Sequence, residues 1–333
     1  MQKYRAALIG CGKIGAGVER YSAKIQPWAH ASVFSQNERT ELVGLVDADA
    51  GKQEKLGKDF PGGPFFTDID DMMRQVKPEI VSIATLPESH AEIVDKVLAY
   101  PVKAILCEKP VAHTIDAAEH LVAACKTKGV PLFINHIRRF DPDIRAAKQR
   151  LSGMGEVMQA HSYYTRGIHN NGTHVIDLFR FFLGDVTAVS GIRNRKTENY
   201  TDLPGEMNID GLLVFAGGAQ AAIQTINSDA YSIFDFDFLA QGGKVALRHF
   251  GFRIEDMGTK PCSAFVGHKE LDDAAPHAVG QVRSFMAPVV THIVDCLEGR
   301  DMPVSTGEDG VAALKAIEAL VESANNGGKL ISL

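Results

Sequence analysis

The chain has 333 residues, of which 45% are hydrophobic, 23% charged and 8% aromatic. These proportions are ordinary for a globular protein and exclude a disordered, collagenous or coiled-coil chain. The formal net charge is −6 and the 35 Lys and Arg residues are scattered, so no basic patch points to a nucleic-acid partner. Because a single hydrophobic core seldom grows to this length, we expect two domains.

The cysteines and the start of the chain bear on the compartment of the protein. The five cysteines are Cys11, Cys107, Cys125, Cys262 and Cys296. Their odd number and the absence of a CxxC pair are typical of reduced thiols in a cytoplasmic protein. The segment after Met1 leads directly into an apolar strand pattern without the parts of a signal peptide, and no run of about 20 uncharged apolar residues follows. We therefore expect a cytoplasmic protein without a membrane partner.

The first third of the chain alternates short apolar runs with helical patterns. Strands are expected at residues 5–9, 41–46, 80–84, 103–107 and 131–134, and helices at 91–99 and 115–128. This alternation is typical of right-handed βαβ units around a parallel sheet. It predicts an N-terminal Rossmann domain over residues 1–135.

The pattern changes after about residue 136. Asp141 and Pro142 form a good N-cap and first-turn pair, which predicts a helix through Leu151. Strand-like segments follow at 156–165, 186–195, 209–215, 220–227, 234–240 and 244–248, and helical ones at 173–182, 279–297 and 308–324. Consecutive strands joined by tight turns predict an open, mostly antiparallel sheet. The fold class is therefore α/β, with a second α/β domain over residues 136–333 that includes the C-terminal helix and tail.

A glycine-rich turn follows the first strand and opens a helix. Gly10, Gly12 and Gly15 form a GxGxxG pattern, with Lys13 and Ile14 between the last two glycines. Such glycines permit a tight turn, close approach of the backbone to a pyrophosphate, and close helix–strand packing, while the helix N-terminus offers N–H groups to phosphates. We expect these residues to bind a dinucleotide; the alternative is a glycine-rich turn without a ligand.

Asp47 ends the second strand, where an acidic residue bonds the adenosine ribose hydroxyls. Its distance from Gly15 exceeds the roughly 20 residues of the usual pattern, and we attribute the excess to an insertion around residues 21–29. Asp49 adds negative charge and no Arg follows Asp47 directly. These features favour NAD over NADP; an exposed Asp without a ligand is the alternative.

The sequence Cys107-Glu108-Lys109-Pro110 follows another strand of the parallel sheet. The carboxyl ends of such strands are where open α/β sheets bind ligands. Taken alone, Lys109 is better explained as a lysine in a surface ion pair. Thr85 and His90 follow the strand at 80–84 and are expected at the same edge.

Four motifs occur in one order: GCGKIG at 10–15, EKP at 108–110, NHIRRFDP at 135–142 and GTHVID at 172–177, the last followed by LFRFFLGD. In this combination, and in its C-terminal segment, the chain resembles the Gfo/Idh/MocA family of oxidoreductases over nearly its whole length. The resemblance implies a Rossmann domain, a substrate-binding α/β domain with an open sheet, a substrate between them over the nicotinamide, and homo-oligomers, either dimers or tetramers.

The resemblance also implies roles for individual residues. Lys109 matches the lysine that contacts the substrate hydroxyl and positions the nicotinamide, and His174 matches the proton donor or acceptor. Many members carry an Asp four residues before this His, where the present chain has Asn170, which can hydrogen-bond but cannot carry a negative charge. We expect Gly172 and Thr173 to form the turn into the helix, with His174 in its first turn.

The remaining candidates are neighbours of these motifs. Thr85, His90 and Glu108 are expected on the cofactor side, and Arg139, Tyr163, Arg166 and Asp177 on the substrate side. A solvated helix-entry pair with Arg138 is an equal alternative for Arg139, and sheet packing is an equal alternative for Tyr163 and Arg166. Asp177 is expected to orient its neighbours. His161, His169 and His174 match no metal-binding spacing, so we expect no metal.

The predicted function is transfer of a hydride between NAD and a hydroxyl or keto carbon of a sugar, nucleotide sugar or cyclitol. The nicotinamide supplies the hydride chemistry, and the protein places the carbon and moves a proton. Two alternatives stay open. One is a cofactor-binding regulator without turnover, which Asn170 motivates. The other is a member with tightly bound, internally recycled NAD.

Overall fold

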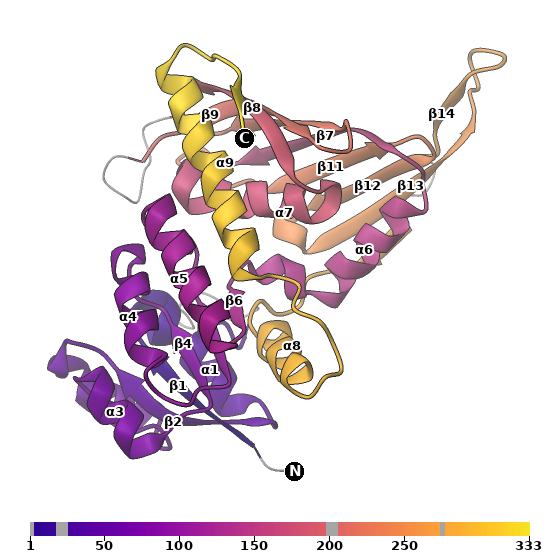
Figure 1. Ribbon diagram of the computed structural model, residues 1–333. Coiled ribbons are helices and arrows are strands. Elements are labelled where there is room, and N and C mark those ends of the chain that lie inside the picture. The colour runs from indigo at the N-terminus through magenta and orange to yellow at the C-terminus, as the bar shows by residue number, and fades with distance from the viewer. Residues whose placement is uncertain (1–2, 18–25, 198–205, 274–276) are drawn as a thin grey trace. The chain divides into compact units, whose positions relative to one another are not determined.

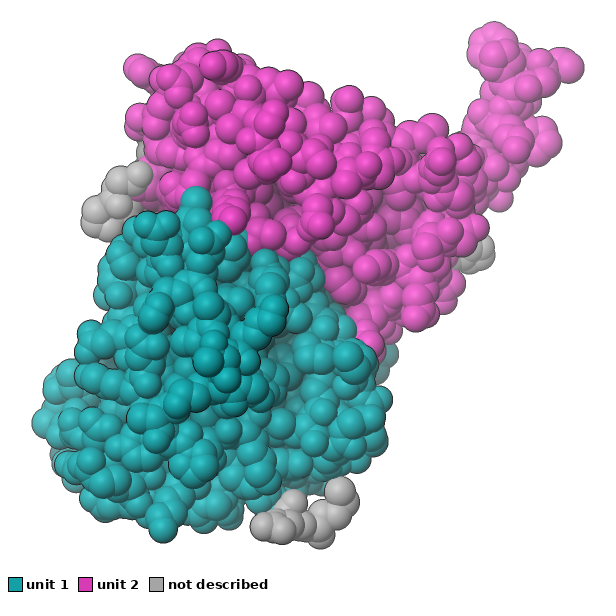
Figure 2. All heavy atoms as spheres, in the orientation of Figure 1, with its two compact units in different colours: residues 1–140, 283–311 teal, residues 141–282, 312–333 magenta. Residues whose placement is uncertain are grey.

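The computed structural model describes residues 3–17, 26–197, 206–273 and 277–333 (Figure 1). The chain divides into two compact units, and each is described by itself. Unit 1 comprises residues 1–140 and 283–311, and unit 2 comprises 141–282 and 312–333 (Figure 2). The segment 283–311, which the sequence assigned to the second domain, belongs to unit 1 because Val289, Val290 and Ile293 lie in the core of that unit.

Unit 1 is built on a six-stranded parallel sheet of order β3-β2-β1-β4-β5-β6. The strands are β1 (Tyr4–Ile9), β2 (Thr40–Val46), β3 (Phe65–Phe66), β4 (Ile80–Ile83), β5 (Ala104–Cys107) and β6 (Leu132–Ile134). The last four residues of β1 are buried without alternation, as in a sheet covered on both faces. The strand order reverses between β1 and β4, and ligands of such sheets bind at that point.

Helices cover both faces of this sheet. They are α1 (His30–Gln36), α2 (Gln53–Asp59), α3 (Ile69–Val76), α4 (His90–Val97), α5 (Ile115–Lys128) and α8 (Ala287–Leu297). Helices α1 and α8 pack in one core with Leu8 and Leu106, and α3, α4 and α5 lie on the opposite side of the sheet (Figure 1). The bounds of α5 agree with the prediction because Thr114 caps its first turn and Gly129, at φ +66°, ends it.

Two predictions for this part of the chain need correction. Helix α8 begins at Ala287 rather than at residue 279, because Pro288 suits a first turn and residues 277–280 form a strand instead. Strand β3 was missed because it has only two residues. Much of the insertion proposed at residues 21–29 lies outside the described residues.

Unit 2 is built on a mixed sheet of order β14-β13-β12-β11-β7-β10-β9-β8-β16, with β15 on β13. Its strands are β7 (Val157–Tyr164), β8 (Val186–Arg193), β9 (Ile209–Phe215), β10 (Gln220–Thr225), β11 (Asp235–Ala240), β12 (Gly243–Arg248), β13 (Arg253–Pro261), β14 (Lys269–Leu271), β15 (His277–Gly280) and β16 (Ile331–Ser332). The mostly antiparallel sheet is confirmed. The exception is β10, which pairs parallel with β7 because α7 (Thr173–Leu183) separates β7 from the β8–β9–β10 meander.

One face of this sheet is covered by α6 (Pro142–Ser152), α7 and α9 (Gly307–Asn325). Asp141 caps α6 as predicted, since its side chain accepts hydrogen bonds from the N–H groups of Asp143 and Ile144. On the covered face, Phe179 of α7 lies 5.2 Å from Phe236, ring centre to ring centre. No described helix is long and apolar enough to cross a membrane.

Candidate active site

The glycine turn of unit 1 has the geometry that a dinucleotide requires. Gly10 has φ +94°, and a Cβ there would lie 2.7 Å from the backbone of Ala84 after β4. A Cβ at Gly15 would lie 2.0 Å from the carbonyl oxygen of Gly10, so any side chain would force the turn off β1. A Cβ at Gly12, in contrast, meets nothing within 4 Å. The first and third glycines are therefore required by packing, and the second leaves the loop open where a pyrophosphate would approach.

Asp47, directly after β2, is tied to this turn. Its Oδ2 accepts a hydrogen bond from the N–H of Cys11 at 2.9 Å and lies 2.7 Å from Nζ of Lys52, while Oδ1 accepts from the N–H of Asp49. Burial acts to raise the pKa of Asp47, but these hydrogen bonds outweigh it and the pKa lies below its ordinary value. The acid predicted for the ribose is thus ionised, beside the glycine turn and paired with a lysine.

A hollow of about 330 Å³ opens beside this turn. It is lined by Cys11, Gly12, Lys13, Ala16, Gly17, Gly51, Lys52, Lys55 and Leu56. Three lysines therefore line it, two of them after Asp47 on a segment for which the sequence suggested only negative charge.

Thr85 lies in the loop that follows β4, the neighbour of β1, and His90 is the first residue of α4. Ser89 donates a hydrogen bond to the hydroxyl of Thr85 at 2.8 Å. His90 is fully buried, and its ring lies 3.2 Å from the carbonyl oxygens of Thr85 and Val111. Burial lowers the pKa of His90, so the ring is neutral and donates to one of these carbonyls at a time. His90 joins the Thr85 loop to the segment after Lys109 and is enclosed by protein.

Glu108 is held on both carboxylate oxygens. Oε1 lies 2.8 Å from Nε2 of His30 and accepts a hydrogen bond from the side-chain amide of Asn135 at 2.6 Å. Oε2 accepts from the N–H of Lys109 at 3.2 Å. Burial acts to raise the pKa of Glu108, yet His30, Asn135 and the charge of Lys109 hold it below its ordinary value. The partly exposed Lys109 thus follows a fixed carboxylate at the carboxyl end of β5.

Arg139 lies in the short 3₁₀ helix η5 (Ile137–Phe140) of unit 1 and is buried. Its guanidinium lies 2.9 Å from Oδ1 of Asp309 and donates to the carbonyl oxygen of Val304 at 3.1 Å. These contacts join β6 to the returning segment 283–311. These contacts give Arg139 a role in packing, and its burial is contrary to the solvated helix-entry pair that the sequence left open as the alternative.

In unit 2 a continuous helical segment carries Asn170 and His174. The π-helical turn η6 (Gly167–Gly172) runs directly into α7, and Gly172 has helical angles of φ −58° and ψ −34°. Helix α7 begins at Thr173 with His174 in its first turn, as predicted, but Gly172 is helical and not a turn, because a π-helical turn starts at Gly167, after Arg166 in the left-handed region at φ +69°. Asn170 and His174 are both partly exposed, and their spacing of four puts them on one side of the segment.

The first turn of this segment is anchored by residues that the sequence analysis missed. The N–H groups of Gly167, Ile168 and His169 donate to the side chain of Asn208, the carbonyl of Met207 and Oε1 of Glu206, respectively. His169 also lies 3.4 Å from Glu206 through Nδ1 and 3.2 Å from Glu318 through Nε2. Glu206 and Glu318 raise the pKa of His169 to about 9.

The paired His169 is expected to make stability depend on pH. Because its pKa is higher in the folded state, its contribution is complete below pH ~6.5 and is lost as the pH rises through about 9. The full shift corresponds to roughly 3 kcal/mol, which solvent screening at this partly exposed ring reduces to about 1–2 kcal/mol. Urea unfolding at pH 6 and 9.5 should show this loss in the wild type and not in His169→Gln. The control is His161→Gln, whose ring nitrogen lies 3.0 Å from the side-chain oxygen of Gln224; equal pH profiles for wild type and His169→Gln would contradict the assignment.

The other residues of unit 2 that were predicted on the substrate side lie in different places relative to His174. Asp177 is buried on α7, one turn after His174. Tyr163 is 38% exposed and alternates with the buried Ser162 and Tyr164, so its side chain lies on the sheet face opposite α7. The structure therefore does not bring Tyr163 and His174 together. Arg166 lies at the start of the helical segment that carries His174, and Asp177 lies within it.

Among the described residues, no group of three or more His, Cys, Asp or Glu side chains is arranged to hold a metal ion.

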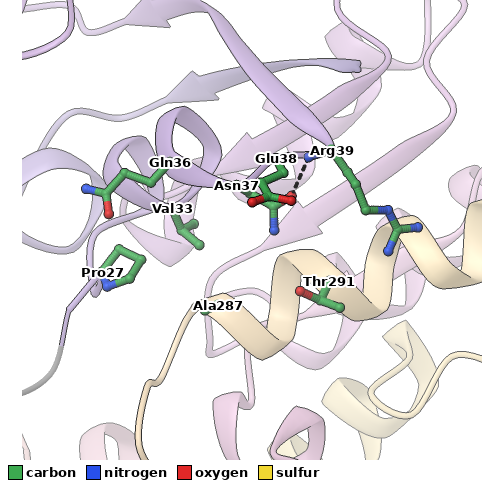
Figure 3. Close-up of a pocket in the computed structure, with 8 residues that line it drawn as sticks. All are labelled: Pro27, Val33, Gln36, Asn37, Glu38, Arg39, Ala287 and Thr291. Carbon is green, nitrogen blue, oxygen red and sulfur yellow. Dashed lines mark hydrogen bonds between the residues drawn. The ribbon is translucent and has the colours of Figure 1, made fainter. Parts of the chain in front are cut away.

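A second hollow in unit 1, of about 390 Å³, is lined by Pro27, Val33, Gln36, Asn37, Glu38, Arg39, Ala287 and Thr291 (Figure 3). None of the predicted site residues lines it.

Comparison with known proteins identifies the family. Residues 4–136 match the NAD-binding Rossmann-fold model of the Gfo/Idh/MocA oxidoreductase family, and residues 168–332 match its C-terminal α/β domain. The chain belongs to the Gfo/Idh/MocA family. It is a dehydrogenase or reductase with an NAD(P)-binding Rossmann fold.

Curated relatives and solved structures agree with this assignment. D-apiose dehydrogenase of Paraburkholderia graminis is 25% identical over 98% of this chain and 89% of its own length. Inositol 2-dehydrogenase of Rhizobium meliloti is 27% identical over 96% of each chain. The WlbA dehydrogenase of Bordetella pertussis, solved with NADH and UDP-GlcNAcA, has a TM-score of 0.76 at 20% identity over 100% of this chain and 99% of its own. A putative NADPH-dependent oxidoreductase from Desulfitobacterium hafniense has a TM-score of 0.81 at 18% identity, over 100% and 98%.

Proposed function

We propose that the protein transfers a hydride between a nicotinamide cofactor and a hydroxyl or keto carbon of a sugar, nucleotide sugar or cyclitol. The observation that carries the proposal is the carboxyl edge of the unit 1 sheet, at the point where the strand order reverses between β1 and β4. The glycine turn, the Thr85 loop and the Glu108–Lys109 segment follow neighbouring strands there. The relatives named as apiose and inositol dehydrogenases support the substrate class.

In this proposal the bound nicotinamide supplies the hydride chemistry, and the chain handles the substrate oxygen and its proton. The ammonium of Lys109 donates a hydrogen bond to the substrate oxygen and stabilises negative charge on it. The imidazole of His174 accepts the hydroxyl proton in the oxidising direction and returns it in the reducing direction. Asn170 serves as a neutral hydrogen-bonding group in place of a carboxylate.

The test is a dehydrogenase screen of polyols, free sugars and nucleotide sugars with NAD and with NADP. Reduction of one cofactor by a member of these classes is the expected result. Cofactor binding without turnover of any of them would favour the regulator that Asn170 motivates. NAD that stays with the purified protein through gel filtration would favour internal recycling.

We propose NAD as the preferred cofactor, with Asp47 near the adenosine ribose. A 2′-phosphate at about 4 Å from this carboxylate would be repelled by roughly 4 kcal/mol at an effective dielectric constant of about 20. Lys52, 2.7 Å from the same carboxylate, offsets part of that repulsion. The two effects together predict an NAD preference of about 10- to 100-fold, smaller than Asp47 alone would impose.

Calorimetric titration with both cofactors measures this preference. Asp47→Ala should shift the ratio of the two dissociation constants toward NADP, and Lys52→Ala should shift it further toward NAD. Lys58→Ala is the matched control, because Lys58 pairs with Glu54 on the same helix and does not line the hollow. Tighter binding of NADP than of NAD by the wild type would contradict the role of Asp47.

We also propose a homo-oligomer and a cytoplasmic location. The face of the unit 2 sheet opposite α7 carries the partly exposed apolar side chains of Tyr163, Leu212 and Leu239, a surface that suits a second copy of the chain. A protein that sediments as a monomer at micromolar concentration would contradict the oligomer. The five free thiols support a reducing compartment.

A further inference from the structure

A buried hydrogen-bonded network lies next to Lys109 in unit 1 and joins helix α1 to three strands. Nδ1 of His30, the first residue of α1, lies 2.6 Å from the hydroxyl of Ser82 on β4. Nε2 of the same ring lies 2.8 Å from Oε1 of Glu108, directly after β5. Asn135, directly after β6, donates to the same oxygen at 2.6 Å. His30 and Ser82 have no exposed surface, and Glu108 retains 7%.

This order of Ser, His and Glu is also that of a hydrolytic triad, but burial excludes that chemistry here. A nucleophilic hydroxyl must reach a substrate, and Ser82 is enclosed inside β4. The hydrogen bonds among these three groups therefore hold parts of the protein in place and do not act on a substrate. Their common partner is the Glu108 carboxylate, whose second oxygen accepts the N–H of Lys109.

Stability alone does not account for a charge in this place. A buried carboxylate loses its hydration, and an apolar replacement of a buried ionic pair is often neutral or stabilising. The Glu108 carboxylate instead accepts hydrogen bonds from the side chains of His30 and Asn135 and from the backbone N–H of Lys109. The result is a single orientation of the carboxylate and of the following peptide, together with a fixed negative charge one residue before Lys109.

We propose that His30 and Asn135 are positioning residues for the reaction. They hold the Glu108 carboxylate and, through it, fix the backbone and the electrostatic surroundings of Lys109 so that its ammonium meets the substrate oxygen. The inference rests on the proposed function, in which Lys109 contacts the substrate. His30 acts through Glu108 and Lys109 and does not touch substrate or cofactor.

The test compares two replacements of His30. His30→Leu removes the donor to Glu108, and His30→Gln keeps a neutral donor of similar reach. We expect His30→Leu to lower kcat about 10- to 100-fold, by analogy with the loss found when residues that orient metal ligands are replaced, with KM and the NAD dissociation constant nearly unchanged. His30→Gln should recover most of the loss. Rates are expressed per NAD-binding site, so that misfolded protein does not count.

A matched control separates positioning from packing. His292 is also a buried histidine of unit 1 with an acidic partner, since its Nδ1 lies 3.2 Å from Asp301. His292→Leu should lower the midpoint of thermal unfolding and leave kcat per site at the wild-type value. An equal fall of kcat in His30→Leu and His292→Leu would overturn the proposal, as would a His30→Gln no more active than His30→Leu. If His30→Leu does not fold, Asn135→Ala makes the same test, because Asn135 donates to the same oxygen of Glu108.

A double variant distinguishes failure of this inference from failure of the proposed function. Because His30 acts through Lys109, His30→Leu should cause no further loss of kcat in a Lys109→Ala background. Independent losses that add would overturn the positioning role. If the wild type turns over no member of the proposed substrate classes, the proposed function fails, and if Lys109→Ala keeps normal turnover, the role of Lys109 fails. If Lys109→Ala is impaired and His30→Leu is not, only the present inference fails.

Discussion

Lys109→Ala is expected to lower kcat about 10²–10³-fold on the true substrate, the usual cost of losing one preorganised donor to a developing oxyanion. The dissociation constant for NAD should change little, because the glycine turn and Asp47 are proposed to hold the adenosine and phosphate parts. The measurement is steady-state kinetics combined with calorimetric NAD titration of the same preparations.

The matched control for this variant is Lys103→Ala. Lys103 precedes β5, at the opposite end of the strand from Lys109, and pairs with Glu79 at 2.7 Å. Its removal should affect stability slightly and kcat not at all. Near-normal turnover of Lys109→Ala would show that the lysine after β5 is only part of an ion-paired surface.

His174→Ala is expected to lower kcat about 10²–10⁴-fold, the range of general acid–base catalysis, with NAD affinity intact. The pH–rate profile of the wild type should fall on its acid side as the His174 ring becomes protonated and can no longer accept the hydroxyl proton. Asn170→Asp should move that acid limb to higher pH, because a carboxylate four residues away on the same helical face favours the charged ring.

His169 provides an internal check on this pH profile. Since Glu206 and Glu318 raise the pKa of His169 to about 9, this neighbouring ring is protonated across the expected acid limb. If the limb lies near pH 9 and disappears in His169→Gln, it reports the titration of His169 and not that of His174. An unchanged profile in Asn170→Asp would contradict the coupling, and an active His174→Ala would contradict the role of His174 as a whole.

The sequence predicted most reliably those features that local chemistry determines. Five strands of unit 1, the cap of α6 and both ends of α5 agree because each depends on a few adjacent residues, such as Thr114 and Gly129 for α5. The glycine turn was also predictable, since Gly10 and Gly15 answer steric demands that only glycine meets.

Partners far apart in the sequence could not be predicted in this way. His30 and Glu108 are 78 residues apart and His169 and Glu318 are 149 apart, and no local pattern indicates either pair. Tyr163 illustrates a second limit. Strict alternation along β7 predicts that the strand has two different faces, but it does not tell which face helix α7 covers.

The return of residues 283–311 to unit 1 has a consequence for biosynthesis. Phe133 of β6 bridges to Thr306, the N–H of Ile134 donates to the carbonyl oxygen of Ser305, and Met286 and Ile293 lie in the same core as β1 and β5. These partners leave the ribosome only after all of residues 141–282. One side of the nascent Rossmann sheet therefore stays incompletely covered while the whole intervening segment is translated, and apolar surface exposed in this way favours aggregation.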